Sequence, residues 1–415
     1  MLDQRAGART TAGAGTGSSR YGSLRQGRGR SSRPIGTWPF LGVAVASFGG
    51  PLALAALVAP AGVEDASASA GLAMLAAAIA FTIPLTIWLR YSEHASSSGG
   101  LYGFVEAAAG RRVALVQAAI WTISYVLYVV YTTVQIVYDL LPAVLPSEHR
   151  YQSVLALLIP LALVTVIVSG RTVALLVLGA VAISQLALAA VLDGVTLAHI
   201  PLSASSFGTS APTGALVRTS AQTSLLYICG SLPLFLGGEV AAPARTIRRG
   251  LVAAFGITAL VVTLAVAPLA AAPGFTHADV PGVTLVQQYV GAGLGRAIGV
   301  GIAVSIAGVM LCEYLALTRL LSAVSAWRPR AVALALGAVF IAAAPLTRSD
   351  PQGVYSALLE PSLLALWLSQ LIVFAVYPRF AIRRGQRALP ALTLSMLASA
   401  FAIYGLWLTI SHPAS

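Results

Sequence analysis

Two short stretches combine residue types that suit ligand binding by the main chain inside otherwise apolar segments. They are Ala46-Ser47-Phe48-Gly49-Gly50-Pro51 and Cys229-Gly230-Ser231-Leu232-Pro233. Glycine and proline interrupt helices, and an unpaired backbone group in hydrocarbon costs several kcal/mol, so broken helix at membrane depth survives only where it is buried in protein or lines a cavity. The two stretches therefore predict either a ligand-binding site or a segment that changes conformation.

In both stretches the proline follows the glycine, and proline is favoured at the first position of a helix. We therefore expect helices to restart near Pro51 and Pro233, aiming free N–H groups and the positive end of the helix dipole at one point. A carboxylate suits that environment, and the carbonyls of the helices that end there suit an ammonium group or a small cation. A zwitterion of amino acid type satisfies both. The alternative interpretation is that glycine and proline only kink closely packed membrane helices.

Three acids inside apolar segments are further candidates, because intramembrane acids are functional by default. Glu239 lies close in sequence to three arginines, which favours an ion pair or an inner gate over substrate contact. Glu313 is about 28 Å along its span, which favours a structural role at the inner interface. Glu360 precedes Pro361 near the outer surface, where it is a candidate for an outer gate or a proton site.

Two further spans carry polar or small side chains on one helical face. In residues 113–142 they recur every three or four positions, and the alternatives are a packing seam or a cavity wall. Trp121 and Tyr125 lie about 12 and 18 Å into this span, the depth at which a substrate would bind, so we predict that they line the pocket. In residues 294–318 a small-residue stripe includes Ser305; it indicates helix contact, with a hydroxyl that is also available to a cation.

The elements that must position these residues are membrane spans. Of 415 residues 58% are apolar and 9% charged, against roughly 25% charged in a soluble domain. Windows of about 20 apolar residues predict eleven spans. They are residues 38–60, 68–89, 113–142, 151–169, 172–193, 221–241, 250–272, 294–318, 330–346, 354–378 and 388–411.

The charges predict the orientation. Arginine supplies all 25 positive charges, and 21 of them fall in the amino-terminal tail and in the loops on its side. The positive-inside rule therefore places the amino terminus in the cytoplasm and, with eleven spans, the carboxyl terminus outside a cell inner membrane. Residues 1–36 are rich in glycine, serine and arginine, which predicts a disordered basic tail before a permease domain at 37–411.

The two interruptions occupy matching places. Each is in the first of five consecutive spans, so residues 38–193 and 221–378 form two repeats of opposite orientation, followed by an extra span at 388–411. Interrupted segments at corresponding positions of two halves are typical of inverted-repeat transporters that bind their substrate near the middle of the membrane. The fold class predicted is an all-α membrane protein with a 5+5 inverted-repeat core in which spans one and six are broken.

Two motifs resemble a known family. The run from Ser98 to Glu106, SGGLYGFVE, followed by Gly110-Arg111-Arg112, resembles the signature before the third span of permeases in the amino acid-polyamine-organocation superfamily. The run from Gly238 to Arg249 resembles the one that closes their sixth span. The resemblance implies a leucine-transporter-like fold and secondary active transport of amino acids or related amines. It also implies substrate contacts from spans one and six, with help from spans three, eight and ten.

The sequence also departs from this family. It has eleven predicted spans where the family usually has twelve, and Cys229-Gly230-Ser231 replaces the usual Gly-Phe-Glu. Span five has no lysine, so the variant that places an ammonium group in the cation site finds no match. The coupling ion, proton or sodium, is therefore left open.

We expect a permease that moves a small amino acid or related amine by alternating access. The alternatives are a carrier of polyamines or other organic cations, an exporter, or a non-transporting membrane sensor or subunit with the same fold. No metal site, cofactor, nucleic-acid partner or enzymatic centre is expected, because the sequence offers no catalytic pair inside a span. The predicted substrate-binding residues are Ser47, Phe48, Gly49, Gly50, Trp121, Tyr125, Ile228, Cys229, Gly230 and Ser231, and the gate or coupling candidates are Ser305, Glu239, Glu313 and Glu360.

Overall fold

Long helices account for most of the chain. The structure, a computed structural model, describes residues 33–145, 150–325 and 327–411, and nine helical segments within them are long and apolar enough to cross a membrane. They are Thr37–Gly62, Glu64–Ala95, Arg111–Val144, Arg171–His199, Pro243–Ala271, Ala292–Val324, Pro329–Ser349, Pro351–Arg383 and Ala388–Ser411. The other two expected spans are the helix Gln152–Val168 and the interrupted segment 213–239. The predicted all-helical membrane fold is confirmed.

Several spans consist of more than one element. The first half contains α1 (Thr37–Ser47), α2 (Pro51–Ala53), the π-helix η1 (Leu54–Val58), α3 (Ala59–Gly62), the 3-10 helix η2 (Glu64–Ser69), α4 (Ala70–Ala95), α5 (Leu101–Ala109), α6 (Arg111–Val134), the π-helix η3 (Gln135–Leu140), α7 (Leu141–Val144), α8 (Gln152–Val168) and α9 (Arg171–His199). The second half contains α10 (Thr213–Leu225), the 3-10 helix η6 (Leu226–Glu239), α11 (Pro243–Val266), the 3-10 helix η7 (Ala267–Ala271), α12 (Pro281–Tyr289), α13 (Ala292–Val324), α14 (Pro329–Ser349) and α15 (Pro351–Arg383), with α16 (Ala388–Ser411) after it.

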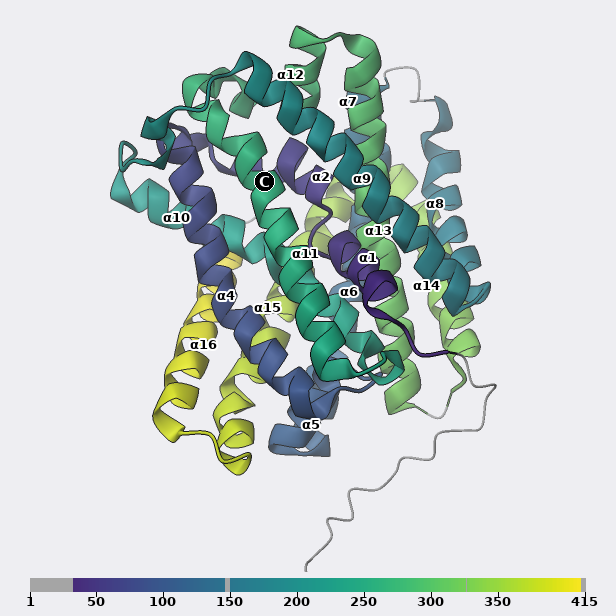
Figure 1. The fold of residues 1–415 in the computed structure, drawn as a ribbon. Helices are drawn as coiled ribbons and strands as arrows, with labels where there is room; N and C mark the ends of the chain where they lie inside the picture. Colours follow the sequence, from purple (N-terminus) through teal and green to yellow (C-terminus); the bar gives the residue numbers. More distant parts are fainter. Residues whose placement is uncertain (1–32, 146–149, 326, 412–415) are drawn as a thin grey trace, which may run out of the picture. The chain divides into compact units, whose positions relative to one another are not determined.

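The broken first span lies in the centre of the bundle. Figure 1 shows α1 and α2 among α9, α11 and α13. α1 is apolar on all sides, as expected of a helix that is buried all round. Gly42 allows α1 to approach α9 closely, because a Cβ there would lie 3.3 Å from the Cα atom of Gly179. Such small-residue contacts are typical of membrane helix pairs.

The third and tenth spans form the opposite wall. The hydroxyl of Ser124 on α6 donates to the carbonyl of Ser362 on α15 at 2.8 Å, and the hydroxyl of Ser362 donates back to the carbonyl of Ser124 at 2.8 Å. The rings of Tyr131 and Tyr355 are 5.6 Å apart along the same antiparallel pair. α16 packs on the far side of α15, where the hydroxyl of Ser395 donates to the carbonyl of Phe374 at 2.8 Å.

The two halves repeat more than their interruptions. The nine-residue helix α5 stands between the second and third spans, and the nine-residue helix α12 stands between the seventh and eighth. Gly110, with φ of 89°, and Gly291, with φ of 131°, turn the chain into the following spans. Only glycine adopts such backbone angles readily, so the same local device begins the third span of each half.

The predicted disordered tail falls largely on residues 1–32, which lie outside the described residues. The described residues from Ile35 onward belong to one compact unit. Ile35 is buried and pairs with the end of the sixth span: its N–H donates to the carbonyl of Glu239 at 2.8 Å, and its carbonyl accepts from the N–H of Ala241 at 2.9 Å. The start of the first span is thereby fixed to the end of the sixth.

Candidate functional site

The first interruption is a sharp break between two helical pieces. α1 ends at Ser47, and Gly49 and Gly50 have positive φ angles of 74° and 68°. Pro51 is then the first residue of the next helical piece, and the N–H of Leu54 donates to the carbonyl of Gly50 at 3.0 Å. Residues with a Cβ rarely adopt these angles, so the glycine pair makes the break possible. The predicted restart at Pro51 is confirmed.

The second interruption has a different form. α10 ends at Leu225, and the chain continues as a 3-10 helix through Pro233 to Glu239. The predicted restart of a helix at Pro233 is therefore wrong, because that residue lies inside a continuous 3-10 segment. Runs of 3-10 helix longer than three or four residues are uncommon and often mark a functional hinge or strain. The preference of proline for the first position of a helix does not predict whether the segment around it is an α-helix or a 3-10 helix.

The two interruptions touch each other. A Cβ at Gly230 would lie 2.2 Å from Cε1 of Phe48, so only a residue without a side chain fits there. Phe48 is fully buried, and its ring lies 6.2 Å from that of Phe81 and 5.9 Å from that of Phe255. Tyr227, in the 3-10 segment, joins the same aromatic cluster at 5.5 Å from Phe81. The meeting of two interrupted spans, which the sequence predicted, is thus present in the structure.

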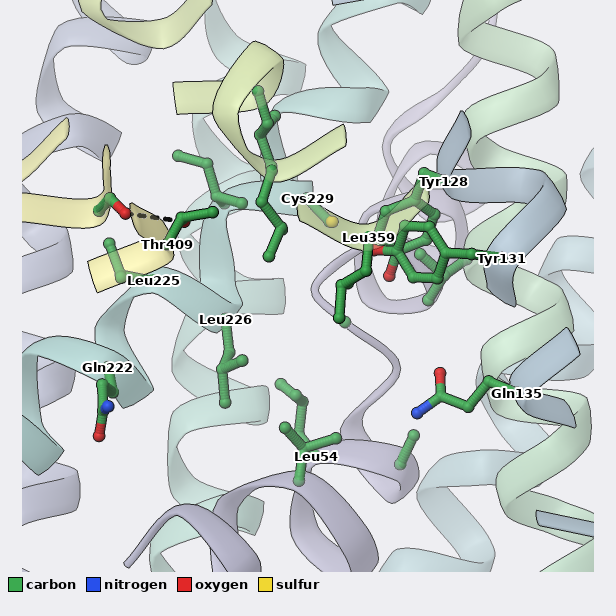
Figure 2. A pocket seen from close by; sticks show the side chains of 18 of the residues that line it. Leu54, Tyr128, Tyr131, Gln135, Gln222, Leu225, Leu226, Cys229, Leu359 and Thr409 are labelled. Carbon is green, nitrogen blue, oxygen red and sulfur yellow. Dashed lines mark hydrogen bonds between the residues drawn. The ribbon is translucent and has the colours of Figure 1, made fainter. Parts of the chain in front are cut away.

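A cavity of about 410 Å³ opens beside this contact. Figure 2 shows Tyr128, Tyr131 and Gln135 on one side of it and Gln222, Leu225 and Thr409 on the other. The lining comes from both interruptions and from spans three, eight and ten, with α16 in addition. Its residues are Gly49, Ala53, Leu54, Val58, Tyr128, Tyr131, Gln135, Gln222, Leu225, Leu226, Ile228, Cys229, Ile306, Val309, Tyr355, Leu359, Leu363, Leu366, Trp367, Gly405, Leu408 and Thr409.

The structure places the predicted substrate-binding residues in two layers. Gly49, Ile228 and Cys229 line the cavity. The remaining residues of the two interruptions, Ser47, Phe48, Gly50, Gly230 and Ser231, do not line it. Ser231 is fully buried, and its hydroxyl has no hydrogen-bond partner within the described part of the chain. The interruptions therefore supply both a wall of the cavity and the packed layer behind it.

Trp121 and Tyr125 lie behind the cavity instead of lining it. The ring of Trp121 is 4.2 Å from that of Tyr125 and 4.4 Å from that of Phe235 in the 3-10 segment, and all three side chains are buried. The next turns of α6 supply the wall, through Tyr128 and Tyr131. Among the cavity-lining residues, Tyr128 and Gln135 belong to the polar helical face that the sequence predicts for this span. The sequence does not single out Tyr355 and Trp367 on the tenth span, because nothing in its pattern distinguishes them from ordinary core aromatic residues.

Ser305 meets the first interruption. Its hydroxyl donates to Oε1 of Gln185 on α9 at 2.5 Å, and a Cβ at Gly50 would lie 2.3 Å from that hydroxyl oxygen. Ser305 and Gln185 are both buried, and the amide nitrogen of Gln185 has no hydrogen-bond partner in the described residues. The small-residue stripe of α13 thus packs against the first interruption, and the hydroxyl of Ser305 on this stripe forms a hydrogen bond with Gln185.

Glu239 forms an ion-pair cluster. Its carboxylate lies 2.7 Å from Nε of Arg319, and it accepts hydrogen bonds from a terminal guanidinium nitrogen of Arg319 at 3.3 Å and from one of Arg171 at 3.1 Å. The expected partners were the arginines of the following helix, Arg245, Arg248 and Arg249, but they lie along an open groove on α11. The cluster instead joins the end of the 3-10 segment to α9 and α13. The ion pair expected from the sequence is present with different partners.

The other two acids lie in contrasting places. Glu313 is fully buried, and neither oxygen of its carboxyl group has a hydrogen-bond partner among the described residues. This is a core position and not the interface expected from its distance along the span. Glu360 is half-buried on α15, next in sequence to the cavity-lining Leu359.

The two family-like motifs pack against each other. A Cβ at Gly100, where φ is 52°, would lie 2.6 Å from the ring of Phe235, and a Cβ at Gly238 would lie 2.6 Å from the hydroxyl of Ser98. The glycines of each motif therefore allow the loop before α5 to contact the 3-10 segment. No group of three or more histidine, cysteine, aspartate or glutamate side chains suited to a metal is present in the described ranges.

Comparison with known proteins identifies the fold. No family model and no curated protein matches the sequence. Among solved structures, the chain is similar to a Na⁺-coupled sialic acid symporter in a substrate-bound outward-open state, with a TM-score of 0.60 and 12% identity over 92% of this chain and 91% of that one. It is also similar to MhsT in complex with L-phenylalanine, with a TM-score of 0.62 and 12% identity over 92% of this chain and 99% of that one. The predicted leucine-transporter-like fold is confirmed.

Proposed function

We propose that this protein is a secondary active transporter of the amino acid-polyamine-organocation type, which carries an amino acid or related amine across the cytoplasmic membrane by alternating access. The observation that carries the proposal is the contact between two interrupted spans at the edge of a cavity lined by spans one, three, six, eight and ten. Irregular backbone at membrane depth is tolerated where it lines a cavity or is buried in protein, and transporters of this architecture bind their substrates there.

The cavity offers separate environments for the parts of such a substrate. The helical piece that begins at Pro51 continues to Gly62, so its first N–H groups suit a carboxylate near Gly49 and Ala53, which line the cavity. The last carbonyls of α1, directly before Gly49, suit an ammonium group. Leucine and aromatic side chains form most of the remaining wall, and a wall of this kind favours an apolar side chain on the substrate. An amino acid with an apolar side chain satisfies all three.

The Glu239 cluster supplies a candidate gate. It joins the sixth span to α9 and α13, so the cavity reaches the end of the bundle that carries Glu239 only after these ion pairs separate. The arginine distribution places this end in the cytoplasm. We therefore assign the described conformation to a state closed on the cytoplasmic side, with the amino terminus on that side.

Counterflow in proteoliposomes tests the proposal. Vesicles containing the purified protein are loaded with unlabelled L-leucine, L-phenylalanine or putrescine, and uptake of the same labelled compound is followed. We expect saturable counterflow of an apolar amino acid. Counterflow of putrescine alone would show a polyamine carrier and would overturn the assignment of an apolar amino acid as the substrate. Binding of a probe without any counterflow would show a sensor and would overturn the proposal as a whole.

A pair of variants on one helix locates the site. Leu359→Trp adds bulk to the cavity wall, whereas Leu368→Trp changes an exposed position two turns further along α15. Filling a closed space costs typically 1–3 kcal/mol, which corresponds to a loss of binding of roughly five- to 150-fold. We expect that loss in Leu359→Trp and unchanged counterflow in Leu368→Trp. Equal counterflow in the two variants would place the substrate elsewhere.

A further inference from the structure

Glu313 continues the face of α13 that lines the cavity. Ile306 and Val309 line the cavity, and Glu313 follows Val309 by four positions. Spacings of three and four place side chains on the same side of a helix, and four residues correspond to about 6 Å along its axis. The carboxyl group therefore lies directly beyond the cavity wall, in the direction of Arg319.

Within the described residues, Glu313 belongs to no ion pair, and neither of its carboxyl oxygens has a hydrogen-bond partner. Groups close enough to sense its charge include neutral acids: the phenols of Tyr125, Tyr128 and Tyr131 on α6 and the thiols of Cys229 on the 3-10 segment and Cys312 on α13 itself. Three of these residues, Tyr128, Tyr131 and Cys229, also line the cavity. Burying an unpaired ion costs far more than burying the neutral group, so the closed conformation requires a protonated Glu313.

The ion-pair cluster lies further along the same helix. Arg319 follows Glu313 by six positions on α13, about 9 Å further along the helix, and binds Glu239. Along the axis of α13, Glu313 thus lies between the cavity-lining residues and the ion-pair cluster. Separation of the cluster would admit water to the carboxyl group, where the ionised form is stable; its O–H bond then breaks and the proton passes to water.

We propose that Glu313 is the proton-binding site that couples conformational change, and with it transport, to a transmembrane pH gradient. The inference rests on the proposed function and adds the coupling ion to it. The carboxyl group gives its proton to water on the gate side when the gate opens, and the carboxylate takes up another proton from the cavity side when the gate closes, so one proton crosses the protein in each cycle. A pH gradient of the appropriate polarity then biases the cycle, without any requirement for sodium.

The test uses the vesicles that show counterflow, in sodium-free buffer, with labelled L-leucine as the probe and pH gradients of both polarities. Wild-type protein is expected to accumulate the probe several-fold above equilibrium under one polarity. Glu313→Gln, which resembles the protonated form, is expected to keep counterflow within about twofold and to lose accumulation under both polarities. Glu106→Gln, at a half-buried acid of α5 that lies outside the cavity and the ion-pair cluster, serves as the matched control and keeps accumulation.

Accumulation by Glu313→Gln at the wild-type level would overturn the proposal. So would a wild-type protein that accumulates the probe under a sodium gradient and under neither pH gradient. Absence of counterflow with every probe would instead overturn the proposed function, and the two failures are therefore distinguishable.

An infrared measurement tests the site without transport and without reliance on a folded variant. The wild-type protein at neutral pH is expected to show the carbonyl band of a protonated carboxyl group that resists exchange into heavy water. Its absence from the wild-type spectrum would overturn the proposal. A band of undiminished intensity in Glu313→Gln would assign it to another acid, such as the buried Asp193, and would equally overturn the proposal.

Discussion

A methyl group added at Gly230 tests whether the two interrupted spans touch. A Cβ there would lie 2.2 Å from the ring of Phe48, whereas ordinary contacts begin at 3.4 Å, so the backbone and the ring would have to separate by 1.2 Å. The ring has little freedom to move, because it packs between those of Phe81 and Phe255. Overpacking of this kind typically costs about 1–3 kcal/mol, and we expect Gly230→Ala to lose that much of the free energy of unfolding.

The measurement is a double-mutant cycle with Phe48→Leu, read from unfolding by sodium dodecyl sulfate in mild detergent. The smaller leucine makes room for the methyl group, so we expect a favourable interaction energy of at least about 1 kcal/mol between the two changes. Gly256→Ala on α11 is the control, because a Cβ there meets nothing within 4 Å, and alanine in place of helical glycine stabilises by about 0.5–1 kcal/mol. Additive effects, or a Gly230→Ala variant as stable as Gly256→Ala, would show that the two interruptions do not touch.

Three further predictions concern the gate, the wall and the loop helix. Glu239→Gln removes the charge that holds two arginines, so a membrane-impermeant maleimide applied from the cytoplasmic side should label Cys229 several-fold faster; an unchanged rate would argue against a gate. Ser362→Ala removes one of two reciprocal hydrogen bonds between α6 and α15 and should cost about 0.5–1.5 kcal/mol in detergent unfolding; no loss would mean that water replaces the bond. Burial, followed by a hydrogen bond to the carboxylate one turn on, raises the pKa of Tyr102 to about 12. Stability from this group is complete below its ordinary pKa of 10.0 and is lost as the pH rises through about 12, so Tyr102→Phe should show a smaller loss of melting temperature over that interval than wild type.

Local backbone chemistry made part of the site predictable. The pair Gly49 and Gly50 needs positive φ, and Pro51 suits the first turn of a helix, so three adjacent residues specify the first break without help from the rest of the chain. The glycine and proline of the sixth span carry the same signal, but the choice between α and 3-10 geometry depends on packing against Phe48 and the loop before α5. That packing is not a local property, and the predicted restart at Pro233 failed for this reason.

Depth and pairing were harder to predict than backbone breaks. Counting 1.5 Å per residue placed Trp121 and Tyr125 at substrate depth, but the cavity begins one turn further along α6. Glu239 was expected to pair with Arg245, Arg248 or Arg249, but these residues lie along an open groove on α11. Its partners, Arg171 and Arg319, are 68 and 80 residues away in the sequence. Such contacts follow from the packing of whole helices, which a single sequence does not specify.

The Glu239 ion pairs and the buried Glu313 lie at the interface between the same two elements, the 3-10 segment and α13, so a movement of one element against the other affects both. Cys229 and Glu239 belong to the same 3-10 segment, while Glu313 and Arg319 belong to the same helix, α13. Cys229 lies close enough to Glu313 to sense its charge, and Glu239 forms an ion pair with Arg319, so the same two elements approach each other at both places. If each element moves as a rigid piece, separating the ion pair also shifts the cover of the carboxyl group. Opening the gate and hydrating the acid are then a single event, which is the condition for coupling a proton to the movement of a substrate.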